Sequence, residues 1–151
     1  MRLSQNFTLR ELVKSQTAER KQIDNTPDDR IIDNLKQTTR RILQPVRDYY
    51  KIPFSPSSGY RSAALSLAVG SSTSSQHCAG RAVDFEVPTI DNFALATWVA
   101  DNLEFDQLIL ECYRLGEPYS GWVHVSWVPD ERRYQSLTYV IGSGYSYGLN
   151  Q

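Results

Sequence analysis

The 151-residue chain has few cysteines and no excess of basic residues. It has only two cysteines, Cys78 and Cys112, and their spacing fits no zinc ribbon. We therefore expect two free, partly buried thiols. A formal net charge of -1 gives no electrostatic attraction to nucleic acid or to an anionic membrane. The arginine pairs at 40–41 and 132–133 are typical of a solvated surface and do not indicate a nucleic-acid partner.

Long hydrophobic runs are also missing. No stretch approaches the roughly 18 consecutive apolar residues that a membrane span needs. Residues 1–12 lack the apolar segment of a secretory signal. We therefore expect no membrane partner and, in the absence of an export signal, a cytoplasmic location.

The overall composition is typical of a globular protein. A hydrophobic fraction of 40% and an aromatic fraction of 11% are ordinary values for a folded domain. The length fits one domain spanning residues 1–151, which we expect to act as a monomer.

Start signals for helices are clear in the first third of the chain. Thr8 and Glu11 form a capping-box pattern, with Phe7 placed as its staple residue. Residues 25–29 combine a cap with Pro27 at the first helical position and acidic residues in the first turn. The helix that follows shows a helical apolar period up to Val46, and we expect Pro45 to bend or divide it.

Strand signals dominate the second half. Residues 81–87 alternate between apolar and polar positions, and a helix is expected at 91–103. Residues 107–113 and 121–127 are separated by a turn and predict an antiparallel hairpin, and 135–147 can add an edge strand. The predicted fold class is α+β, with a small antiparallel sheet flanked by helices.

Three side chains are candidates for a metal site. Alternation places Asp84 and His124 on the more polar faces of their strands, where neighbouring strands would bring them together. Gly80 lets the chain turn so that His77 reaches the same point. Two imidazoles and a carboxylate leave a fourth position open, as in catalytic zinc sites. Periodicity alone leaves another interpretation open, in which the histidines are structural and Asp84 pairs with Arg81.

These residues lie in recognisable motifs. The segment Ser75-x-His77-x-x-Gly80-x-Ala82-x-Asp84 resembles the signature of the zinc D-Ala-D-Ala carboxypeptidases and their peptidoglycan-endopeptidase relatives. The segment from Trp122 to Ser126 is similar to the second ligand segment of that family, and residues 58–61 and 43–47 resemble its phage and bacterial branch. The resemblance covers residues 7–126, which is most of the chain.

The resemblance implies a hedgehog-like zinc peptidase fold and hydrolysis of an amide bond in peptidoglycan stem peptides. It implies Zn²⁺ as cofactor, with His77, Asp84 and His124 as ligands and Arg61 as a residue that engages the substrate. Cleavage as a carboxypeptidase or as an endopeptidase stays open. A phage lysis protein held in the host cytoplasm and a virion-associated protein both fit.

One departure from the family concerns the catalytic base. Many members have a glutamate three residues before the last histidine, where this chain has Gly121. A hairpin turn centred near residues 117–118 would place Glu111 opposite His124, so we predict Glu111 as the base, ahead of Glu117 and Glu86. Gly121 also fits an alternative function, that of an inactive peptidoglycan-binding or structural phage protein.

Overall fold

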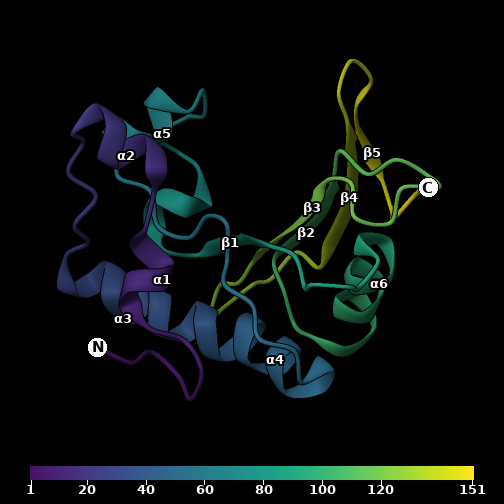
Figure 1. The fold of residues 1–151 in the computed structure, drawn as a ribbon, viewed down its shortest axis with the longest axis horizontal. Helices are drawn as coiled ribbons and strands as arrows, with labels where there is room; N and C mark the ends of the chain where they lie inside the picture. Colours follow the sequence, from purple (N-terminus) through teal and green to yellow (C-terminus); the bar gives the residue numbers. More distant parts are fainter.

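The N-terminal part of the chain is helical and the C-terminal part forms a sheet (Figure 1). The computed structural model describes all residues from 1 to 151. The helices of the first part are α1 (Leu9–Val13), α2 (Gln16–Lys21), α3 (Asp29–Thr38), the π-helix η1 (Thr39–Leu43), α4 (Gln44–Tyr50) and α5 (Ala63–Ala68). The second part contains the 3-10 helix η2 (Gln76–Ala79), β1 (Ala82–Phe85), α6 (Asn92–Asn102), β2 (Gln107–Glu111), β3 (Trp122–Ser126), β4 (Gln135–Val140) and β5 (Gly144–Tyr147).

Side-chain caps fix the helix starts. The Thr8 side chain accepts from the Glu11 N–H and the Glu11 carboxylate accepts from the Thr8 N–H, which confirms the predicted capping box. The start of α3 differs from the prediction, because Asp28 is the cap and Pro27 precedes it. The Asp28 carboxylate accepts from the Ile31 N–H at 2.8 Å, whereas Thr26 donates its N–H to Asp24 in a separate turn.

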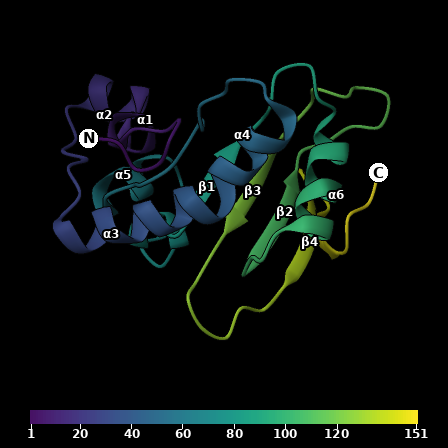
Figure 2. The same cartoon turned by 90° about the horizontal axis from the view of Figure 1, so that it is seen from below.

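The division predicted at Pro45 is not present, because Pro45 lies inside α4 and the π-helical segment η1 connects α4 to α3. The Gln44 N–H donates to the Thr39 carbonyl five residues back, so η1 holds one extra residue per turn directly before the proline. Because Pro45 has no N–H to donate, this wider turn accommodates it without ending the helical path from α3 to α4. Figure 2 shows that path as one continuous helical run.

The sheet has the strand order β1-β3-β2-β4-β5. The predicted hairpin of β2 and β3 is confirmed, and the α+β class with it. The sheet is mixed rather than purely antiparallel, because β2 and β4 run parallel. The predicted edge strand at 135–147 is a hairpin of two strands, β4 and β5.

One face of the sheet packs against the core, and the other carries the candidate site residues. The core includes Val83, Phe85, Leu108, Leu110, Val123 and Val125 from one face, together with residues of the helices. Figure 2 shows α4 and α6 lying over the sheet. Strand alternation therefore places Asp84, Ile109, Glu111 and His124 on the opposite face, away from this core. No helix of the chain is long and apolar enough to cross a membrane.

Candidate metal centre

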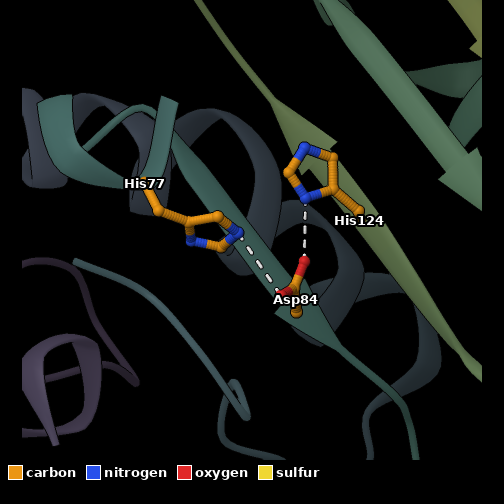
Figure 3. Close-up of side chains that lie close together, drawn as sticks. All are labelled: His77, Asp84 and His124. Carbon is orange, nitrogen blue, oxygen red and sulfur yellow. Dashed lines mark hydrogen bonds and ion pairs between the residues drawn. The ribbon is translucent and has the colours of Figure 1, made fainter. Parts of the chain in front are cut away.

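Strand register brings Asp84 and His124 together. The two residues are direct partners in the antiparallel pair of β1 and β3, so their side chains share one face, as predicted. His124 Nδ1 lies 2.8 Å from Asp84 Oδ1 (Figure 3). The carboxylate thus faces an imidazole from the neighbouring strand.

His77 reaches the same carboxylate from the short helix η2. Ser75 caps this helix by accepting from the His77 N–H, and Gly80 ends it with a φ of +69°. A Cβ at Gly80 would lie 3.1 Å from the Ile31 carbonyl oxygen, so a side chain at this position would be strained. The predicted turn at Gly80 is therefore present, and it joins η2 directly to β1.

The His77 ring has one nitrogen that donates and one that faces the carboxylate. Nδ1 lies 2.7 Å from the Gly59 carbonyl oxygen, which can only accept, so Nδ1 carries the proton. Nε2 lies 3.3 Å from Asp84 Oδ2 (Figure 3). This nitrogen is buried and has no hydrogen-bond partner. In the neutral ring, a lone pair on Nε2 therefore faces a carboxylate oxygen, an arrangement that a cation would satisfy.

The Asp84 carboxyl is held in its ionised form. Burial alone would raise its pKa, but the hydrogen bond with the His124 ring and the neighbouring imidazoles lower the pKa well below the usual range. Its side chain is 13% exposed. An ionised carboxylate is the form that binds a metal ion.

The three residues fit a zinc ion by donor type and spacing. Candidate ligand atoms of His77, Asp84 and His124 all lie within 4.8 Å of one another. Imidazole nitrogen and carboxylate oxygen are both common zinc ligands. The cluster opens into a cavity of about 330 Å³, so a fourth position stays accessible to water or substrate.

Arg61 lies beside the cluster, inside the cavity wall. Its Nη2 lies 3.8 Å from Asp84 Oδ2, its side chain is 15% exposed, and its Nε is buried without a hydrogen-bond partner. The side chain is therefore not that of a solvated surface arginine. Arg81, the alternative partner of Asp84, donates instead to Gln37 and stacks over Trp127.

The predicted position of Glu111 is wrong by two residues along the hairpin. Ile109 lies opposite His124, and Glu111 lies opposite Trp122. Because a shift of two residues preserves the face, Glu111 still points to the side of His124 and lines the same cavity. Burial and the charge of Asp84 raise the pKa of Glu111, which makes its carboxylate a stronger proton acceptor.

The backbone at Gly121 explains why that position carries no glutamate. Gly121 has a φ of +66°, and a Cβ there would lie 2.0 Å from the Glu111 carbonyl oxygen. No side chain fits in this conformation. The backbone of Gly121 thus lies directly against the backbone of Glu111, a residue that lines the cavity.

The other candidate bases lie elsewhere. Glu117 is exposed and pairs with Arg114 in the β2–β3 loop. Glu86 is exposed and accepts from Asn92 Nδ2 at 2.9 Å. Neither lines the cavity that contains the cluster.

Sequence reasoning missed a polar cluster that supports η2. The buried Asp106 accepts from Gln76 Nε2 at 2.9 Å and from Arg133 Nη2 at 2.7 Å. Gln76 and Arg133 both line the cavity. Asp106 follows a helix in an irregular segment with no periodic pattern, so the sequence offered no signal for this contact.

Comparison with known families agrees with the geometry. No curated protein sequence matches the chain. The sequence model of the Peptidase M15 family matches residues 5–126, a range that includes both histidines, Asp84, Arg61 and Glu111. Since this match covers most of the molecule, the chain belongs to the Peptidase M15 family.

Proposed function

We propose that the protein is a zinc-dependent peptidase that hydrolyses an amide bond in the peptide stems of bacterial peptidoglycan. The observation that carries this proposal is the convergence of His77, Asp84 and His124 at an open cavity in a chain of the Peptidase M15 family. The signature around residues 75–84 supports the choice of zinc and of peptidoglycan, because it resembles that of the zinc D-Ala-D-Ala carboxypeptidases.

His77, Asp84 and His124 would hold the ion. The Gly59 carbonyl orients the His77 ring and keeps its proton on Nδ1, which leaves Nε2 free to bind. When bound, zinc supplies Lewis acidity that polarises a substrate carbonyl and makes water more acidic. The protein contributes a fixed ligand set with little rearrangement, because two ligands come from paired strands.

Glu111 is placed to move protons. Its carboxylate lines the cavity next to the cluster, and the rigid strand β2 holds it there. In the proposed reaction Glu111 takes a proton from the attacking water and delivers it to the leaving amine. Its raised pKa suits this exchange, because the group must both accept and release a proton.

Arg61 is placed to bind substrate. Its guanidinium is permanently charged and has donors that no protein hydrogen bond saturates, Nε among them. The donors can hold a substrate carboxylate or the carbonyl oxygen as negative charge develops on it. We assign Arg61 to substrate rather than to zinc because guanidinium offers no lone pair to a metal.

An inactive peptidoglycan-binding protein of a phage particle is the alternative that Gly121 favours. The presence of Glu111 in the same cavity supports the enzyme instead, since a base is available from another strand.

One experiment separates the two functions. Zinc-loaded protein is incubated with purified peptidoglycan, and the released fragments are identified by mass spectrometry alongside a zinc determination. New peptide termini together with bound zinc are the expected result. Bound zinc without any cleavage product would favour the binding protein, and failure to bind zinc would contradict the proposal.

A further inference from the structure

The cavity that holds the candidate metal centre is the middle one of three adjoining cavities. Arg61 also lines a larger cavity of about 880 Å³ between α2 and residues 55–58. Tyr145 also lines a cavity of about 410 Å³ against the β4–β5 hairpin, and Gln107 and Ile109 are shared in the same way. The metal centre is therefore flanked by open space on two sides, which we call the α2 arm and the hairpin arm.

The two arms lie on opposite sides of the centre. Figure 1 and Figure 2 both place α2 and β4 far apart, with β1 and β3, the strands that carry Asp84 and His124, between them. A chain that enters along one arm can therefore pass the cluster and leave along the other.

The arms differ in chemistry. The α2 arm is lined mainly by polar side chains, among them Lys14, Ser15, Gln16, Thr17, Ser57 and Ser58. The hairpin arm is more apolar: Leu137, Tyr145 and Tyr147 line it beside Gln107 and Gln135, whose side-chain amides bond to each other at 2.8 Å. Tyr145 and Tyr147 are 61% and 82% exposed. Exposed aromatic rings next to amide groups are suited to an apolar side chain and a polar backbone at once.

The hairpin arm is also a feature outside the family match. The match ends at residue 126, whereas Leu137, Tyr145 and Tyr147 lie on β4 and β5. This wall of the groove is thus built by residues that the family assignment does not describe.

Resting on the proposed function, we propose that the groove binds peptide on both sides of the cleaved bond, so that the enzyme is an endopeptidase that cuts peptide cross-links. A carboxypeptidase needs a site that ends close to the reacting bond, with a cation for the terminal carboxylate. Arg61 is the cation nearest the cluster, but open space continues past it into the α2 arm. In the reaction, the oxygen of water bonds to the carbonyl carbon, the C–N bond breaks, and the amine takes a proton.

The test compares two defined substrates with the zinc-loaded enzyme. One is a cross-linked stem-peptide dimer with an internal scissile bond, and the other is a monomeric pentapeptide stem with a terminal bond. We expect kcat/KM for the dimer to exceed that for the pentapeptide by roughly tenfold or more, because only the dimer fills both arms. Preference for the pentapeptide would overturn the proposal while leaving the proposed function intact, and cleavage of neither substrate would overturn both.

Variants test each arm separately. Tyr147→Ala removes an aromatic wall of the hairpin arm, and Gln16→Trp adds bulk to the α2 arm. Each should lower kcat/KM for the dimer by roughly tenfold, mainly through KM, because contacts far from the reacting bond provide binding. The matched control is Tyr119→Ala, since Tyr119 is 62% exposed and lines none of the three cavities, and it should leave the kinetics unchanged. Wild-type dimer kinetics in both arm variants would contradict the proposal.

Discussion

Replacing Glu111 by glutamine tests the assignment of the base most sharply. The change keeps the size of the side chain and removes the proton acceptor. General acid–base catalysis contributes about 10²–10⁴-fold to a rate. We therefore expect turnover to fall by about a hundredfold or more, which corresponds to about 2.7 kcal/mol of transition-state stabilisation.

The structure also predicts what the substitution leaves unchanged. Glu111 is not one of the three clustered residues, so zinc content should stay at the wild-type level. Because burial raises the pKa of Glu111, the ionised carboxylate destabilises the folded state above that pKa, and a neutral amide removes this cost. The melting temperature of Glu111→Gln at pH 7 should accordingly equal or exceed that of the wild type.

The assay measures stem-peptide hydrolysis, zinc content and melting temperature for Glu111→Gln and for a matched control. Glu117→Gln is that control, because Glu117 is an exposed loop residue paired with Arg114 outside the cavity. The control should keep wild-type turnover. A fully active Glu111→Gln enzyme together with an inactive Glu117→Gln enzyme would refute the reasoning.

Three further substitutions probe the surroundings of the site. Arg61→Lys should retain zinc but lose roughly tenfold or more in kcat/KM, because lysine cannot reproduce a two-pronged contact, and unchanged kinetics would remove Arg61 from substrate binding. Gly121→Ala should lower the free energy of unfolding by more than about 2 kcal/mol in denaturant titration, since its Cβ would overlap the Glu111 carbonyl; a neutral effect would contradict this backbone geometry. Hydrogen bonds from the Arg133 side chain lower the pKa of Asp106 to about 2, so the stability that this carboxylate adds is complete above its unfolded pKa near 4 and is lost as pH falls toward 2. Asp106→Asn should therefore be less stable than the wild type by about 2 kcal/mol at pH 7, with a difference that shrinks at acidic pH, and a difference independent of pH would exclude this linkage.

Local signals in the sequence predicted the elements that position the ligands. The alternation around Asp84 and His124 was sufficient to predict that the two side chains share a face, because the period of a strand is two residues. The capping box at Thr8 was also predictable, because its contacts span only three residues. The glycine at position 80 marked the turn that brings in His77.

These local signals could not predict the register of the hairpin. A turn centred near residues 117–118 would pair Glu111 with His124, but β2 and β3 pair about a centre one position earlier, between residues 116 and 117. Moving the centre of the turn by one position shifts the pairing by two, so Ile109 lies opposite His124. The shift is even, which is why Glu111 stayed on the predicted face. The parallel pairing of β4 with β2 could not be predicted either, because no turn in the sequence connects these two strands directly.

The central claim is that His77, Asp84 and His124 bind one zinc ion. Elemental analysis of the purified wild-type protein and of the His77→Ala/His124→Ala double variant tests it most directly, with circular dichroism to establish that both are folded. The account predicts one zinc per wild-type chain and none in the double variant, because a lone carboxylate cannot retain the ion. Full zinc occupancy in the folded double variant would contradict it.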